Sequence, residues 1–277
     1  TDVQTGMFRV RNANALGTTT ATKIQSGATL EIAGDISLAD NIELLGGGLL
    51  RNWSGDNSLT RPLLLRGSST VDVRQDSLTL NPTAGNAVSV DLAAAAYNSD
   101  LTLSGSGELV FQGVMNLKDG QPTATYGDFQ QTGNGVARFE NAVLAQRLES
   151  TGGGTIWMDQ PAGSPLVTPP GSSLFLDNGS FVRRDSTETV TVGSLALGAG
   201  GGGISVGTGS TLVWDAPITG TGVFTKAGDG TLRFPATAAI TYTGATRVNG
   251  GTLQVFSASP TNATCSGTGS SSLCPAG

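Results

Sequence analysis

The residues with the clearest chemical potential lie in the stretch VDVRQD, where Asp72, Arg74 and Asp76 occupy alternate positions. In a strand, three such side chains point to the same side. Glycoside hydrolases need two or three acids at one sugar bond, and β-helix lyases need carboxylates for Ca²⁺ with an Arg or Lys base. Opposite charges that alternate on a strand more commonly form a solvated face with modest ion pairing, and we favour that interpretation.

The other candidates for catalysis or metal binding are weaker. The sequence has no histidine, which removes Ser-His-Asp and Cys-His catalysis and most transition-metal sites. Asp35, Asp40 and Glu43 have no second acid cluster that would stack beside them, and Arg183–Glu188 is expected to be a polar loop. We therefore predict no catalytic residue, no metal site and no cofactor, and a protein that is not an enzyme.

Three tryptophans are candidate platforms for binding carbohydrate, because an exposed aromatic ring is a frequent binding hot spot. They are Trp53, Trp157 and Trp214. Trp157 and Trp214 each follow an apolar strand residue by one position. We therefore expect these two to face outward at the edge of a coil or to cap the core.

The elements that must position these side chains belong to a repeat. A small residue, then Ser or Thr, then alternating apolar residues recurs along the chain, as in SGATLEI, GSSTVDV, GDGTLRF and GGTLQV. Most spacings between phrases are one or two units of about twenty residues. The exception is the gap of 27 residues from Leu109 to Val136, which contains the polar insertion Lys118–Asp128. The first apolar residues of the nine phrases are Leu30, Val71, Leu109, Val136, Ile156, Leu174, Leu212, Leu232 and Leu253.

A strand-type phrase repeated about every twenty residues predicts a stacked β-solenoid. One coil cannot bury its apolar face alone, so successive coils stack about 4.8 Å apart and share a narrow core. We predict an all-β protein, a continuous parallel β-helix over residues 1–256 with about 20 residues per coil and about thirteen coils. A β-sandwich is the alternative, but its hairpin-linked strands do not repeat one phrase in register.

Composition limits the partners and the compartment. The formal net charge is −6, which argues against nucleic acid, since nucleic-acid binding needs clustered Lys and Arg. No stretch reaches the roughly eighteen consecutive apolar residues of a membrane span. The chain opens at Thr1 without a signal peptide pattern, and we expect it to be a mature or excised piece of a longer protein.

Cys265 and Cys274 are the two cysteines of the chain, separated by a Ser/Gly-rich run. The run is flexible enough to let them form a small disulfide loop, and no histidine is available to complete a zinc site. Two free thiols are the alternative. We predict the disulfide within a flexible tail at 257–277, which would indicate an oxidising, extracytoplasmic setting.

The segment Ile218–Val255 resembles the autotransporter-associated β-strand repeat of bacterial autotransporter passengers, also called the passenger-associated transport repeat. It contains the Lys-x-Gly-x-Gly-Thr-Leu, Tyr-Thr-Gly-x-Thr-x-Val and Gly-Gly-Thr-Leu-x-Val patterns of that repeat. Residues 1–34 resemble the tail that follows such a repeat. The residues that carry the resemblance are Lys226, Gly228, Gly230, Thr231, Leu232, Tyr242, Thr243, Gly244, Thr246, Val248, Gly250, Gly251, Thr252, Leu253 and Val255.

This resemblance implies a right-handed β-helix passenger displayed outside a Gram-negative-type cell, with a covalently linked outer-membrane β-barrel in the full-length precursor. In the family, the repeat serves secretion and folding of the passenger. We expect a stalk or adhesin whose partners are host surfaces, glycans or other copies of itself. A self-assembling fibre subunit and a polysaccharide lyase or hydrolase on the same scaffold are the alternatives. The cysteine pair departs from the family, whose passengers tend to avoid cysteine.

Overall fold

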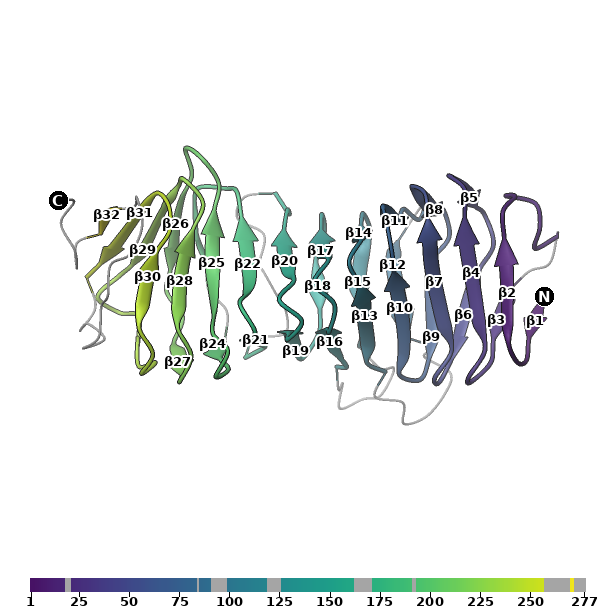
Figure 1. The fold of residues 1–277 in the computed structure, drawn as a ribbon, viewed down its shortest axis with the longest axis horizontal. Coiled ribbons are helices and arrows are strands. Elements are labelled where there is room, and N and C mark those ends of the chain that lie inside the picture. Colours follow the sequence, from purple (N-terminus) through teal and green to yellow (C-terminus); the bar gives the residue numbers. More distant parts are fainter. Residues whose placement is uncertain are drawn as a thin grey trace. The chain divides into compact units, whose positions relative to one another are not determined.

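The computed structural model describes residues 1–17, 21–83, 85–90, 99–118, 126–161, 171–190, 193–256 and 270–271, and within them every regular element is a β-strand (Figure 1). The chain divides into two compact units, Thr1–Gln146 and Arg147–Gly277. Cys265 and Cys274 lie outside the described residues, so their disulfide stays a prediction.

Unit 1 contains three parallel sheets among its described residues. The first consists of β1 (Asp2–Val3), β3 (Thr22–Ile24), β6 (Ile42–Leu45), β9 (Leu63–Arg66), β12 (Asn86–Val90), β15 (Val114–Asn116) and β18 (Val143–Leu144). The second consists of β2 (Met7–Val10), β4 (Thr29–Ala33), β7 (Leu49–Ser54), β10 (Ser69–Val73), β13 (Leu101–Gly105) and β16 (Asp128–Gln131). The third consists of β5 (Ser37–Leu38), β8 (Asn57–Leu59), β11 (Ser77–Leu80), β14 (Glu108–Phe111) and β17 (Val136–Phe139).

Unit 2 also contains three parallel sheets in its described part. One consists of β19 (Arg147–Ser150), β21 (Ser173–Leu176), β24 (Ser194–Leu197) and β27 (Ile218–Gly220). Another consists of β20 (Thr155–Met158), β22 (Ser180–Arg184), β25 (Gly202–Val206), β28 (Phe224–Ala227) and β30 (Thr246–Val248). The last consists of β23 (Glu188–Val190), β26 (Thr211–Trp214), β29 (Thr231–Phe234), β31 (Thr252–Val255) and β32 (Ser270–Ser271).

Paired strands come from successive coils, as a β-solenoid requires. Leu30 on β4 is the register partner of Leu50 on β7, which in turn partners Val71 on β10. Val71 partners Leu103 on β13, across a longer coil. The all-β solenoid is therefore confirmed. The described strands make about ten turns spaced by roughly 22 residues, fewer than the thirteen expected, because several coils are longer than twenty residues.

The nine repeat phrases do not form one column of strands. Val71 lies in the second sheet of unit 1, whereas Leu109 lies in the third. This change of sheet explains why some spacings are not whole numbers of coils. The assignment at Val136 is wrong by one residue: Ala137 partners Leu109 and is buried, while Val136 partners Glu108 and is half-buried.

Aromatic side chains fill part of the core of each unit. In unit 1, the rings of Phe111 and Phe139 stack with centroids 4.6 Å apart, and Phe129 packs edge-on against both. In unit 2, Trp214 is fully buried, so the expectation that it faces outward is wrong. Side chains alternate along a strand, and Trp214 shares the inner face with Leu212, two positions earlier on β26.

Candidate binding face of unit 1

Charged side chains form a column on the outward side of the second sheet of unit 1. Arg9 on β2, Glu31 on β4, Arg51 on β7 and Asp72 on β10 are register partners from strand to strand. Side chains alternate along each strand, and parallel partners stack about 4.8 Å apart. One charged residue per coil, at the same place in each strand, therefore produces a continuous column.

The column alternates in sign, and its members pair with one another. Arg9 Nε donates to Glu31 Oε1, and Arg51 Nη1 lies 3.6 Å from Glu31 Oε2. Arg51 Nε donates to Asp72 Oδ2 at 2.9 Å. Arg74, which follows β10, donates from Nε to the same oxygen at 2.7 Å. Each carboxylate is therefore held between two guanidinium groups.

Asp72 is a structural carboxylate. Its side chain is almost fully buried, and its Oδ1 accepts the Ser104 hydroxyl at 3.1 Å. Asp76 lies in the turn after β10 with a φ of 57°, and its Oδ2 accepts the Gly55 amide at 2.7 Å. The prediction that Asp72, Arg74 and Asp76 share one strand face is therefore wrong, because the chain turns between them. The ion pairing that we favoured for the stretch VDVRQD is present, since Asp72 pairs with Arg74 and with Arg51.

The face presents its positive charges to solvent and shields its negative ones. The side chains of Arg9, Arg51 and Arg74 are 36%, 22% and 53% exposed, whereas those of Glu31 and Asp72 are 1% and 4% exposed. Three partly exposed arginine side chains therefore lie beside two buried carboxylates. A ligand that approaches this face meets guanidinium groups first.

Trp53 stands on the same outward side, at a β-bulge. The register of β7 against β4 passes from Asn52 directly to Ser54, so Trp53 has no partner on β4. A bulge adds one residue to a strand and redirects its side chain. Trp53 is 45% exposed, and Arg9 Cζ lies 5.6 Å from the centroid of its ring. Trp53 lies two positions after Arg51 on β7, so it presents an exposed aromatic ring beside the charged column.

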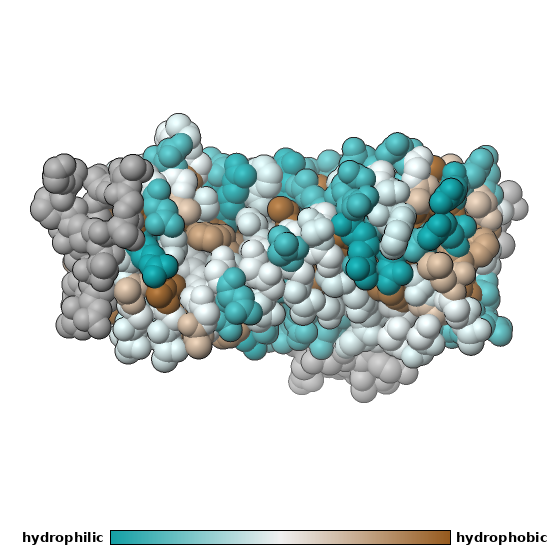
Figure 2. Space-filling model, in the orientation of Figure 1, coloured by the Kyte–Doolittle hydropathy of each residue, from teal (hydrophilic) through white to brown (hydrophobic). Residues whose placement is uncertain are grey.

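We call this surface the Arg–Trp face; its members are Arg9, Glu31, Arg51, Trp53, Asp72 and Arg74. Figure 2 shows hydrophilic side chains gathered over β4, β7 and β10, with hydrophobic side chains beside them. Sequence reasoning missed the column. The signal that could have revealed it is a charge of alternating sign in the middle of the triplets FRV, LEI, LRN and VDV.

The predicted repeat residues lie in unit 2, where Lys226 on β28 is fully buried. Its Nζ donates to the carbonyl oxygens of Ala227 at 2.7 Å, Gly228 at 2.6 Å and Gly250 at 3.0 Å. Burial lowers the pKa of Lys226 to about 8, and the charge of Asp229 partly opposes that shift. Lys226 thus joins two successive coils from inside the core.

The other repeat residues form the core and the connections around Lys226. Leu232 and Leu253 are buried register partners, and the Tyr242 hydroxyl hydrogen-bonds with that of Thr246. Burial raises the pKa of Tyr242 to about 12, and the hydrogen bond with Thr246 partly opposes the shift. Thr231, Val248, Thr252 and Val255 lie on strands, and Gly228, Gly230, Thr243, Gly244, Gly250 and Gly251 lie between strands.

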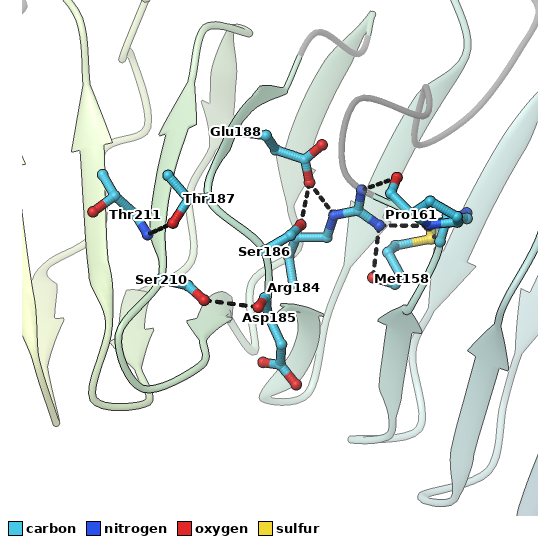
Figure 3. A network of polar contacts seen from close by, with 10 residues as sticks. Met158, Pro161, Arg184, Asp185, Ser186, Thr187, Glu188, Ser210 and Thr211 are labelled. Atoms are coloured by element: carbon cyan, nitrogen blue, oxygen red, sulfur yellow. Dashed lines mark hydrogen bonds and ion pairs between the residues drawn. The ribbon is translucent and has the colours of Figure 1, made fainter.

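A buried charged cluster in unit 2 centres on Arg184, which is fully buried (Figure 3). Arg184 pairs with Glu188, and its Nη1 donates to the Met158 carbonyl at 2.9 Å and to Gln160 Oε1 at 2.8 Å. The polar loop expected at Arg183–Glu188 is shorter than predicted: residues 185–187 connect the strands, while Arg183 and Arg184 belong to β22 and Glu188 to β23. The cluster fixes neighbouring coils to each other.

Unit 2 has arginine–aromatic contacts of its own. Trp157 on β20 is half-buried and faces outward as predicted, with Arg183 Cζ 4.0 Å from its ring centroid. Arg183 also pairs with Asp185, Nη2 to Oδ2 at 2.7 Å. The contact of Arg183 with Trp157 resembles that of Arg9 with Trp53, but Trp157 is less exposed. Arg183 therefore provides a control for variants of the Arg–aromatic contact in unit 1.

Two classes of site are absent from the described part of the chain. No three His, Cys, Asp or Glu side chains there come close enough together to hold a metal ion. No helix there is long and apolar enough to cross a membrane.

Comparison with known proteins places the chain in a family. The family described as Passenger-associated-transport-repeat matches residues 224–255. The chain is 30% identical over 266 residues to the adhesin BmaC autotransporter of Brucella suis biovar 1 (strain 1330). That alignment covers 88% of this chain but 7% of the Brucella protein, so the chain spans a small part of that relative's length. No solved structure matches the chain significantly. Both findings support a segment of an autotransporter passenger that carries a passenger-associated transport repeat, at the extracellular surface of a Gram-negative bacterium.

Proposed function

We propose that this segment is a non-catalytic adhesive part of its passenger and that the Arg–Trp face makes the contact. The observation that carries the proposal is the exposure of Trp53, which has no register partner on β4 and lies beside Arg9. An exposed aromatic ring beside arginine side chains is a composition that suits binding, since binding hot spots are enriched in Trp and Arg.

The rigidity of the face supports this role. Arg9 and Arg51 are held by Glu31, and Arg74 is held by Asp72, so the guanidinium groups are already oriented before a ligand arrives. Pre-oriented side chains lose less conformational entropy on binding than free ones do. The similarity to an autotransporter adhesin supports the same role.

The environment of the acids supports a non-catalytic role. Asp72 is occupied by two arginines and a serine hydroxyl, and Asp76 accepts a backbone amide in a turn. A hydrolase needs two acids within reach of one bond, with one of them able to carry a proton. In the whole protein, we expect the passenger to be linked to an outer-membrane translocator, as is usual in autotransporters.

Adhesion of coated beads tests the proposal. Beads carrying the purified chain should bind cultured host cells more than albumin-coated beads do, and the soluble chain should compete for that binding. Trp53→Ala, compared at equal coating density and equal thermal stability, should reduce attachment. Binding of chain-coated beads no greater than that of albumin beads across several cell types would contradict an adhesive role.

A further inference from the structure

We propose that the Arg–Trp face binds an acidic glycan, a chain of carboxylated or sulfated sugars. This inference rests on the adhesive role proposed above and names the class of ligand. Its basis is the combination of partly exposed arginine side chains with an exposed indole ring on one face of the sheet.

The charges on the face suit an anionic ligand. The side chains of Glu31 and Asp72 are 1% and 4% exposed and those of the three arginines are much more exposed, so the exposed side chains of the column are the positive ones. Arg74 has the most exposed side chain of the three arginines, and its Nε donates to Asp72 Oδ2. A guanidinium offers several N–H donors in a planar fork that matches carboxylate and sulfate oxygens.

The aromatic ring and the spacing suit a sugar chain. An indole offers a broad apolar surface with a polar N–H edge, which matches the apolar face and hydroxyl rim of a pyranose. Arg9 and Arg51 lie on strands separated by one intervening strand, which is roughly 10 Å. That separation is comparable with the length of a disaccharide, so successive acidic units of a polymer can meet successive guanidinium groups.

The net charge of the whole chain makes broad attraction to polyanions an inadequate explanation. At −6, the molecule repels polyanions at long range, and long-range attraction is what drives non-specific binding to nucleic acid. An acidic ligand must therefore be held by local contacts. The indole of Trp53 supplies one such contact, because it packs against the apolar face of a sugar ring and does not depend on the charge of the ligand.

Binding measured by biolayer interferometry tests the inference. The immobilised probes are heparin as a sulfated glycan, hyaluronan as a carboxylated one, dextran as a neutral one, and duplex DNA as a polyanion without a glycan backbone. We expect binding to at least one acidic glycan, with the preferred one identifying sulfate or carboxylate, and no binding to dextran. Exposed ion pairs are screened by salt, so affinity should fall as salt is added.

Variants connect the binding to the face. Trp53→Ala should weaken it about tenfold or more, and Trp53→Phe should restore most of the loss. Arg74→Ala should weaken it about fivefold, since Asp72 keeps Arg51 as a partner. Arg183→Ala, which removes a similar arginine–aromatic contact in unit 2, should leave it unchanged.

Three results would overturn the inference: no binding to either acidic glycan, unchanged affinity in Trp53→Ala, or equally tight binding to DNA. If coated beads still adhere to cells when neither acidic glycan binds, the ligand class is wrong and the adhesive role stands. If neither beads nor glycans bind, both proposals are wrong.

Discussion

Lys226 shows how a single residue of the passenger repeat links two coils. Its Nζ reaches Ala227 and Gly228 in its own turn, and Gly250 in the next coil, 24 residues along the chain. A buried ammonium group is very unfavourable unless hydrogen-bond acceptors replace its water. The three carbonyl oxygens provide those acceptors, and each of them receives a hydrogen bond from Lys226 in return.

The lowered pKa of Lys226 predicts an unusual dependence of stability on pH. The pKa is about 8 in the folded protein and 10.5 for an ordinary lysine. Between these values the unfolded chain binds more protons than the folded one, so the contribution of Lys226 to the free energy of unfolding rises with pH. The rise is at most about 3 kcal/mol and is complete above about pH 10.5.

Urea unfolding of the wild type and of Lys226→Met at about pH 7 and about pH 9.5 measures this contribution. The wild type should gain stability relative to the variant at the higher pH. That range stays below the pKa of Tyr242, which burial raises to about 12. If the difference in free energy of unfolding between the wild type and Lys226→Met does not change with pH, the lowered pKa of Lys226 is contradicted.

The buried carboxylate of Asp72 should matter more for stability than the exposed arginine beside it. Asp72→Ala removes the acceptor of Arg51 Nε, of Arg74 Nε and of the Ser104 hydroxyl, and should cost about 2–4 kcal/mol. Arg74→Ala removes a half-exposed partner while Arg51 remains, and should cost about 1 kcal/mol or less. Chemical denaturation of both variants checks this order; equal losses would show that the burial of Asp72 is not what stabilises the column.

At the scale of elements, the turns between strands stack as closely as the strands do. A Cβ added at Gly230 would lie 2.2 Å from the Gly207 carbonyl oxygen of the preceding coil. Real Cβ atoms do not approach a backbone oxygen so closely, and displacing it would separate the stacked coils. This contact gives a physical reason for glycine at that position of the repeat.

A pair of glycine variants in unit 2 separates this packing effect from backbone strain. Gly230→Ala should cost about 3 kcal/mol, because the methyl group meets backbone that cannot move alone. Gly209→Ala has open space around its Cβ but a φ of 76°, and should cost about 1 kcal/mol. Thermal unfolding of the two variants measures both costs. A smaller loss for Gly230→Ala than for Gly209→Ala would contradict close stacking of the turns.

The elements also show why parts of the site could not be predicted from sequence. The pairing of Trp53 depends on one extra residue in β7 relative to β4, which leaves Trp53 without a register partner on β4, and no local pattern indicates a bulge there. The burial of Asp72 depends on Arg51 and Ser104, which lie 21 and 32 residues away along the chain. Register between coils determines such neighbours, and insertions change that register.

At the scale of the molecule, the fold was largely predictable. Alternating apolar residues at an almost constant spacing are compatible with few folds other than a solenoid, since each coil needs a neighbour to bury its apolar face. Coil length was less predictable, because insertions such as Lys118–Asp128 lengthen single coils without changing the strand pattern. The sequence pattern of residues 226–255 indicated the passenger-associated transport repeat, and the family match at residues 224–255 confirms that repeat.

The most direct test of the account uses the complete autotransporter displayed on bacteria. The wild type, the double variant Trp53→Ala/Arg74→Ala and the control Arg183→Ala are compared for surface amount by antibody labelling and for adherent bacteria per host cell. The account predicts equal display of all three, about tenfold lower adherence for the double variant, and normal adherence for the control. Wild-type adherence of the double variant at equal display would contradict the claim that the Arg–Trp face makes the adhesive contact.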